Sequence, residues 1–252
     1  MHLEPKTTEA YDARFYAGHV AASLRSARIY LEYLWRFTQP RSVLDVGCGR
    51  GAWLKACHER GSQVLLGYDG GWNSQSEMID DSVRFLSIDL NEPFSVPHKV
   101  DLAMSLEVAE HLLPFVAPQF VRCLTDASDT VLFGAAYTRQ GGTNHINEQQ
   151  HSYWAHLFAE RGFAPFDLFR PVFWGNKDVC FWYRQNTFLY CRRGSAASAR
   201  IEGHGFKEIV EPSFMDCVHP DLFELTSGDP GFKSHVTDLA PSLWRAIRRR
   251  LA

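Results

Sequence analysis

The sequence predicts an α/β fold in which a seven-stranded, mostly parallel sheet carries helices on both faces. Two observations lead to this prediction. Short apolar runs of strand length alternate with segments long enough for crossover helices between residues 42 and 191, and strands that alternate with helices form parallel sheets. The first apolar run also leads directly into a glycine-rich turn that opens a helix-like segment. A ligand site is therefore expected at the carboxyl ends of the strands.

The elements are expected in the following order. Residues 18–38 place apolar side chains at mostly helical spacing and end before Pro40, since proline disfavours a helix at the residue before it. Further helices are expected at 52–61, where Gly61 is the C-cap, and at 151–162. The expected strands are 42–46, 63–68, 83–88, 101–105, 130–133, 163–169 and 187–191.

Three segments follow from this order. Residues 1–40 form an N-terminal helical segment in which Tyr11 and Tyr16 could belong to a lid, and residues 41–195 form the sheet domain. The composition changes at Arg193, so residues 196–252 are expected to be a C-terminal extension. Its last residues, SLWRAIRRRLA, form a short basic amphipathic helix that either touches an anionic membrane surface or a partner, or docks as a plain terminal helix.

Composition and charge narrow the class of protein. The 252 residues include 26 Lys and Arg and 29 Asp and Glu, which leaves a net charge of -3. Nucleic acid is therefore not the expected partner, because proteins that bind it usually carry a basic face. The six cysteines lie far apart without a Cys-x-x-Cys pair, and no signal-like or 18-residue apolar run occurs. We expect a soluble, cytoplasmic protein. The oligomeric state is not indicated.

The glycine turn holds Gly47, Gly49 and Gly51, and glycines at such a turn let the backbone approach a ligand closely. A dinucleotide site needs the spacing G-x-G-x-x-G. The order here is G-x-G-x-G, with Asp45 inside the strand before it, so the spacing disfavours NAD. Acidic residues also follow three later strands, and carboxylates accept hydrogen bonds from hydroxyl and amino groups. They are Asp69, Asp89 and Glu107.

The segment VLDVGCGRGAWL, residues 43–54, closely resembles the first motif of class I S-adenosylmethionine-dependent methyltransferases, which have a Rossmann-like fold. The resemblance implies S-adenosylmethionine as cofactor. It implies that the three glycines lie beside the aminocarboxypropyl chain, that Asp69 binds both ribose hydroxyls, and that Asp89 and Leu90 lie at the adenine. The expected cofactor-binding residues are Asp45, Gly47, Gly49, Gly51, Asp69, Gly70, Asp89, Leu90, Ser105 and Glu107.

Three further motifs extend the resemblance to about residues 10–195. SLEVAEHL (105–112), QGGTNHINEQ (140–149) and WYRQN (182–186) together resemble a bacterial subgroup often found with genes for surface polysaccharide or secondary-metabolite biosynthesis. The resemblance implies a saccharide or another small hydroxylated metabolite as the acceptor. It does not identify the acceptor, because one fold hosts many acceptors.

Methyl transfer from a sulfonium is an in-line displacement, in which the enzyme supplies orientation and, for a hydroxyl acceptor, removes a proton. His145 is the expected general base, with His111 and Glu148 as further catalytic candidates. If a helix begins here, Glu107, Glu110 and His111 share one of its faces, since their spacing is i, i+3, i+4. Alternatively, His145 only makes a hydrogen bond within its loop.

A divalent cation such as Mg²⁺ is a further expectation, because carboxylates and imidazoles together bind such ions. The candidate ligands are Glu107, Glu110, His111 and His145. The Glu-x-x-Glu-His string resembles the metal-binding set of small-RNA 2'-O-methyltransferases and, in part, that of ubiquinone-pathway O-methyltransferases. Many relatives carry the string without a metal. In that case Glu107 contacts the cofactor near its sulfonium, while Glu110 and His111 support the helix.

Other functions stay open at this point. The same cofactor supports methylation at nitrogen or carbon and aminocarboxypropyl transfer. The Glu-x-x-Glu-His string leaves RNA 2'-O-methylation as an alternative, and a non-enzymatic cofactor-binding or scaffold protein is a further one. The aromatic side chains near residues 154–183 either stack on the acceptor or pack in the core. Arg184, Gln185 and Asn186 could supply hydrogen bonds to the acceptor.

Overall fold

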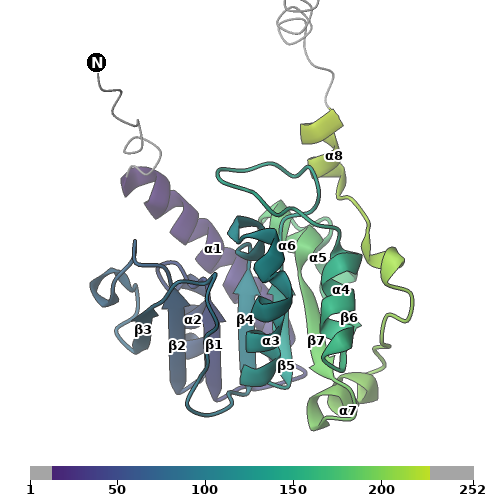
Figure 1. Ribbon diagram of the computed structural model, residues 1–252, viewed down its shortest axis with the longest axis horizontal. Helices are drawn as coiled ribbons and strands as arrows, with labels where there is room; N and C mark the ends of the chain where they lie inside the picture. Colours follow the sequence, from purple (N-terminus) through teal and green to yellow (C-terminus); the bar gives the residue numbers. More distant parts are fainter. Residues whose placement is uncertain (1–12, 228–252) are drawn as a thin grey trace, which may run out of the picture. The chain divides into compact units, whose positions relative to one another are not determined.

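The computed structural model describes residues 13–227, and it describes side chains for residues 20–224 (Figure 1). The chain divides into two units, of which the first ends at Cys217 and the second begins at Val218. The described part of the second unit contains helix α8 (Pro220–Ser227). Tyr11 and the basic segment 242–252 lie outside the described residues, and the side chain of Tyr16 is not described either.

The described residues form one seven-stranded sheet in the order β3-β2-β1-β4-β5-β7-β6. Neighbouring strands among β1 to β5 pair in parallel, whereas β7 runs antiparallel to both β5 and β6. The predicted fold class is therefore confirmed. The strands are β1 (Ser42–Val46), β2 (Val64–Asp69), β3 (Val83–Ser87), β4 (Leu102–Leu106), β5 (Thr130–Gly134), β6 (Phe163–Phe166) and β7 (Phe188–Arg192).

Helices cover both faces of this sheet (Figure 1). Two separate apolar clusters fill the space beneath them, one around Tyr30 and Leu54 and the other around Phe120 and Phe158. The helices are α1 (Ala13–Leu34), α2 (Ala52–Glu59), α3 (Ala117–Ala127), α4 (His151–Glu160), α5 (Arg170–Phe173), α6 (Phe181–Asn186) and α7 (Ala196–Gly203). Shorter 3₁₀ turns are η1 (Gln75–Glu77), η2 (Ala109–His111), η3 (Pro114–Val116) and η4 (Pro212–Met215).

The segment after β6 differs from the sequence prediction. A strand was expected over 163–169, but β6 ends at Phe166 and α5 begins at Arg170. Asp167 causes the change, because its carboxylate accepts hydrogen bonds from the backbone N–H and the Nε of Arg170, at 3.2 and 2.8 Å. The WYRQN motif then forms most of α6, although no helix was expected there. This helix brings the motif's last residue, Asn186, to the start of β7.

The expected C-terminal extension begins inside the first unit. Helix α7 buries Ile201 in the apolar cluster that contains Tyr30. Turn η4 packs on α4, where Asp216 accepts hydrogen bonds from the backbone N–H and hydroxyl of Ser152, at 3.0 and 2.6 Å. The compact unit therefore extends beyond the composition change at Arg193, as far as Cys217.

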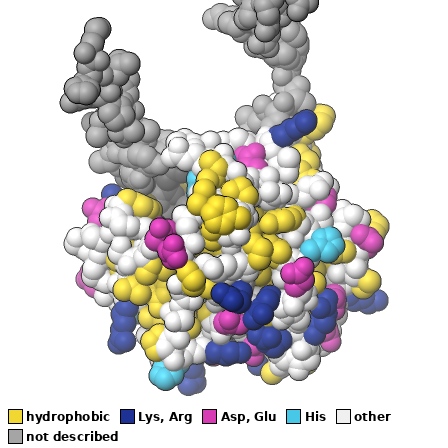
Figure 2. Space-filling view, viewed as in Figure 1, with side chains coloured by type: hydrophobic (Ala, Val, Ile, Leu, Met, Phe, Trp, Pro, Cys, Tyr) yellow, Lys and Arg dark blue, Asp and Glu magenta, His cyan; other side chains and the backbone are white. Residues whose placement is uncertain are grey.

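The face that carries α3 and α4 shows both charge types (Figure 2). Its Lys and Arg side chains gather among acidic ones. Ion pairs among the described residues include Arg161 with Asp126 at 2.7 Å and Lys99 with Asp129 at 2.8 Å. Large apolar side chains also stay exposed, among them Phe115. None of the helices within residues 13–227 is long and apolar enough to cross a bilayer.

Phe158 provides a test of the α4 side of the core. Its ring is fully buried and stacks on Tyr190 with the ring centroids 3.9 Å apart. We expect Phe158→Ala to lower the free energy of unfolding in urea by about 3–5 kcal/mol, because the substitution leaves a cavity. Phe115→Ala is the control. That side chain is 79% exposed, so its change should stay within about 0.5 kcal/mol. A loss below about 1 kcal/mol for Phe158→Ala would contradict the packing described here.

Candidate functional site

A cleft of about 1250 Å³ opens where the parallel strands end. Its walls are formed by the glycine turn after β1 and by the segments after β2, β3 and β4. Helices α1 and α2 contribute two residues each, and α6 contributes one. Most of the residues expected to bind the cofactor line this cleft: Asp45, Gly47, Gly49, Asp69, Gly70, Asp89, Leu90 and Glu107. Gly51 instead caps α2, and Ser105 is fully buried within β4.

Two separate features of the glycine turn require glycine at position 47. Its φ is +82°, a left-handed value that favours glycine, and an added Cβ would lie 2.2 Å from a methyl group of Val108. Gly51 also has a left-handed φ, of +79°. The backbone N–H of Gly47 donates to the carbonyl of Tyr68 at 2.7 Å, which ties the turn to the end of β2. The glycine spacing in the sequence thus reflects both backbone conformation and close packing.

Asp69 ends β2 and holds the glycine turn in place. One carboxylate oxygen accepts a hydrogen bond from the N–H of Gly49 at 2.7 Å, and the other accepts from the N–H of Gly70 at 2.7 Å. Burial raises the pKa of Asp69, while these backbone hydrogen bonds oppose the rise. The Trp72 side chain also donates to this carboxylate and opposes the rise in pKa. A carboxylate has about four acceptor positions, so with three donors in place it can still accept from a hydroxyl group in the cleft.

Asp45 lies inside β1, directly opposite Gly67 of β2 and Met104 of β4. Its side chain lines the cleft but is only 3% exposed. Burial, and then the charge of Asp69, raise the pKa of Asp45 to about 8. The floor of the cleft therefore favours a ligand that carries positive charge or hydrogen-bond donors.

Glu107 follows β4 and adopts a left-handed backbone with φ at 57°. Its N–H donates to the carbonyl of Gly134 at 2.8 Å. The carboxylate accepts hydrogen bonds from Asn186 Nδ2 at 2.9 Å and from Gln140 Nε2 at 3.1 Å. Burial raises the pKa of Glu107 to about 7, although these two hydrogen bonds favour the charged form and oppose the rise. Its carboxyl can therefore exchange a proton near neutral pH.

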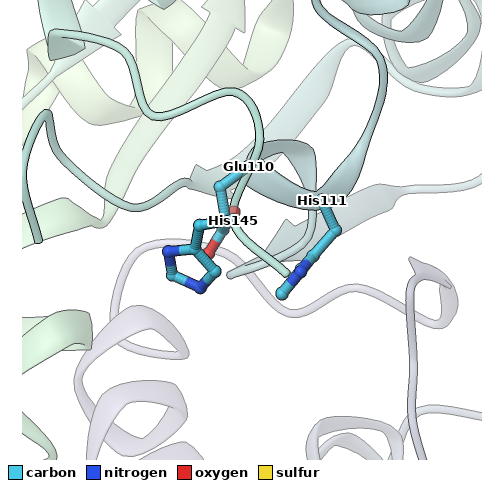
Figure 3. A group of neighbouring side chains, drawn as sticks. All are labelled: Glu110, His111 and His145. Carbon is cyan, nitrogen blue, oxygen red and sulfur yellow. The ribbon is translucent and has the colours of Figure 1, made fainter. Parts of the chain in front are cut away.

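The structure does not place Glu107, Glu110 and His111 on one helical face, which corrects the sequence prediction. Only Glu110 and His111 belong to the short turn η2, and Glu107 precedes it in a left-handed conformation. Glu110, His111 and His145 instead point toward a common space, with one candidate ligand atom from each within 4.8 Å of the others (Figure 3). Glu107 is not part of this cluster, because its carboxylate is held by Asn186 and Gln140.

Glu110 is the most buried member of this cluster. It is 0% exposed, and neither carboxylate oxygen makes a hydrogen bond of standard length and angle to a described residue. The backbone N–H groups of Glu110 and Ala136 are still near enough to favour its charged form. Burial and the charge of Glu107 raise its pKa well above the usual value. Its backbone carbonyl accepts from the N–H groups of Ile146 and Asn147, both at 2.9 Å, so η2 and the 140–149 loop are joined.

The two histidines of the cluster are each oriented by a neighbour. Nδ1 of His145 lies 2.8 Å from a carboxylate oxygen of Glu148, and that oxygen also accepts from the N–H of Gly141 at 2.7 Å. Nδ1 of His111 lies 3.3 Å from the carbonyl of Asn144. When Nδ1 carries the proton, Nε2 of each ring keeps a lone pair.

Only one of the two histidines reaches the cleft. His111 is among the lining residues, whereas His145 and Glu148 are not. The His145 ring packs behind that of His111, with centroids 4.8 Å apart and the ring planes at 85°. Partial burial and the nearby imidazole of His145 lower the pKa of His111. The residue expected from the sequence to be the base thus lies behind a second histidine.

The motif residues expected to meet the acceptor mostly turn inward. Arg184, Gln185 and Asn186 are buried, and Trp154 belongs to the core. Tyr183 lines the cleft, where its hydroxyl lies 3.2 Å from that of Ser23 in α1. The amide contacts of Gln140 and Asn186 to Glu107 were missed by sequence reasoning. Their only sequence signal is that both lie in motifs that flank the ends of strands β5 and β7.

Comparison with known proteins identifies the fold. The sequence matches no protein-family model and no curated protein. Among solved structures, an O-methyltransferase family protein from Burkholderia thailandensis is 14% identical, with a TM-score of 0.50 over 74% of this chain and 62% of that one. This chain thus spans less than two thirds of that protein's length. Magnesium protoporphyrin IX methyltransferase from Synechocystis PCC 6803 with bound SAM is 16% identical, with a TM-score of 0.48 over 76% of this chain and 86% of that one. The chain has the fold of class I S-adenosylmethionine-dependent methyltransferases.

Asp45 gives a pH test of the site. Its pKa is about 8 in the folded chain, against about 3.9 in the unfolded one. A raised folded pKa stabilises the fold below about pH 4, and this contribution is lost as pH rises to about 8. We expect Asp45→Asn, which does not titrate, to gain stability relative to the natural chain over that range, by on the order of 3 kcal/mol.

Urea unfolding at pH 5 and pH 8.5 measures this change. Asp126→Asn is the control, because Asp126 lies on the exposed side of α3. Parallel pH dependences for Asp45→Asn and the natural chain would contradict the assignment.

Proposed function

We propose that this protein is an S-adenosylmethionine-dependent methyltransferase that binds its cofactor in the cleft at the ends of β1 to β4. The observation that carries the proposal is the Asp69 carboxylate, which is tied to the N–H of Gly49 at 2.7 Å and lies within a cleft of about 1250 Å³. A nucleoside needs such an acceptor for its ribose hydroxyls next to a glycine turn that admits its chain. The fold supports the same function.

Each lining residue has a role in this proposal. Asp69 accepts from the ribose hydroxyls, Asp89 and Leu90 contact the adenine, and the turn around Gly47 and Gly49 accommodates the aminocarboxypropyl chain. Glu107 and Asp45 complement the positive charge of this cofactor, since both carboxylates line the cleft. When bound, the cofactor supplies a methyl group on a sulfonium, which is an electrophile that needs no further activation.

We propose a hydroxyl on a saccharide or another small metabolite as the methyl acceptor, with His111 as the group that takes its proton. The sequence favoured His145 for this role, but His111 is the histidine that lines the cleft. Its Nδ1 faces the carbonyl of Asn144, and its lowered pKa keeps the ring neutral at pH 7, so Nε2 can accept a proton. His145 and Glu148 then support His111 from behind.

A divalent cation at Glu110, His111 and His145 is the alternative way to activate the hydroxyl. The donor set fits: the Glu110 carboxylate is buried and makes no hydrogen bond of standard geometry within the described part of the chain, and both imidazoles have Nδ1 engaged elsewhere. Two imidazoles with one carboxylate suit Mn²⁺, Fe²⁺ or Zn²⁺ better than Mg²⁺, which prefers oxygen ligands. These three residues would hold the ion, which would lower the pKa of an acceptor hydroxyl.

Calorimetry with S-adenosylmethionine and S-adenosylhomocysteine tests cofactor binding. We expect Asp69→Asn to raise the Kd about 10- to 100-fold, because the amide has a single acceptor oxygen where two backbone N–H groups and the ribose need acceptors. Asp126→Asn should leave the Kd unchanged. If the natural chain binds neither compound, the proposed function is wrong. S-adenosylhomocysteine formation with hydroxylated acceptors then tests the reaction.

Titration with Mn²⁺ and Zn²⁺ tests the cation site. We expect one ion per chain, and an affinity at least tenfold weaker in Glu110→Gln, which keeps the volume of the side chain but removes its charge. Glu92→Gln, on an exposed carboxylate, is the matched control. Absence of binding at millimolar ion concentrations would leave His111 as the base without a metal.

A further inference from the structure

Two side-chain amides hold the Glu107 carboxylate, one on each oxygen. Asn186 Nδ2 donates to Oε1 at 2.9 Å, and Gln140 Nε2 donates to Oε2 at 3.1 Å. Among the ion pairs of the described residues, none includes Glu107. Neutral amides therefore fix the direction of this carboxyl group, and no described cationic side chain competes with a ligand in the cleft for it.

Neither amide can turn around without losing its own contacts. Asn186 Nδ2 also donates to Gln140 Oε1 at 2.9 Å, so a flipped Asn186 would place its oxygen against two acceptor oxygens. Gln140 Oε1 also accepts from the N–H of Tyr137 at 3.2 Å, which keeps Nε2 directed at Glu107. The two NH₂ groups are thus locked in the one orientation that serves the carboxylate.

The side-chain oxygen of Asn186 is also held in place. Its Oδ1 accepts from Gln185 Nε2 at 3.0 Å and lies 3.1 Å from Nε2 of His151 in α4. Asn186 and His151 are 1% and 2% exposed, so water does not compete for these bonds. His151 of α4 and Gln185 of α6 thus hold Asn186, and Asn186 and Gln140 in turn hold Glu107, which follows β4.

We propose that Asn186 is a positioning residue that, together with Gln140, holds the Glu107 carboxylate at the cleft wall for contact with the cofactor. This role rests on the proposed function, since it requires that the cofactor bind beside Glu107. It also links the two halves of the site, because Gln140 begins the loop that carries His145 and Glu148. Asn186 itself is not a catalytic residue, as it does not line the cleft.

A double-mutant cycle on cofactor affinity tests this role, with S-adenosylhomocysteine as the calorimetric probe. We expect Asn186→Leu, which keeps the shape of the side chain without its donors, to raise the Kd about tenfold or more. Glu107→Gln should weaken binding on its own. If Asn186 acts through Glu107, Asn186→Leu should cause less than about a twofold further change in the Glu107→Gln background.

Two further variants keep the test decisive. Asn186→Asp replaces the donor by an acceptor with little change in volume, so it should also raise the Kd if Asn186→Leu does not fold. Thr125→Val, at a buried site whose hydroxyl bonds to helix α3, should leave the Kd unchanged. Independent effects of Asn186→Leu and Glu107→Gln, which multiply in the double variant, would overturn the proposal while leaving the proposed function standing. No binding by the natural chain would overturn both.

Discussion

The parallel pairing of β1 with β2 and with β4 is the constraint on which the site depends. Parallel strands end at the same edge of a sheet, so residues that are distant in sequence meet there. The pairing sets Asp45 opposite Gly67 and Met104 and brings Asp69 within 2.7 Å of the N–H of Gly49. Asp89 and Glu107 reach the cleft for the same reason, because they follow the parallel strands β3 and β4 closely.

Carboxylates gather at this edge with few positive charges beside them. Asp45 and Glu107 have pKa values raised to about 8 and about 7 by burial, and burial also raises the pKa of Glu110 well above its usual value. Burial of such groups destabilises the ionised form of the folded chain. A ligand that brings positive charge into the cleft offsets this cost, so the same residues that weaken the empty fold favour the binding of a cationic ligand.

Two amides and two imidazoles give the site its internal order. The amides of Asn186 and Gln140 orient Glu107, and Glu148 orients His145 behind His111. The loop between residues 140 and 149 contributes to both arrangements and is itself held by the backbone carbonyl of Glu110. The surroundings of Glu107 and those of His111 therefore belong to one hydrogen-bonded framework.

The sequence by itself determined the fold class, the order of the strands along the chain, and the cleft residues that follow β1 to β4. This is possible because alternation of apolar runs with helical segments, and glycines at a strand end, are local patterns that survive in any tertiary context. Most residues of the expected cofactor set line the cleft, and Ser105 and Gly51 are the two that do not.

Only the tertiary structure decided which side chains of the acceptor region meet. The spacing of Glu107, Glu110 and His111 suggested one helical face, but the left-handed backbone of Glu107 separates it from the other two. His145 joins Glu110 and His111 through a loop whose path no local pattern specifies. The contact of Asn186 with Glu107 spans 79 positions in the sequence. Such pairings depend on how loops and helices pack over the ends of the sheet, and that packing is set by long-range burial and hydrogen bonding.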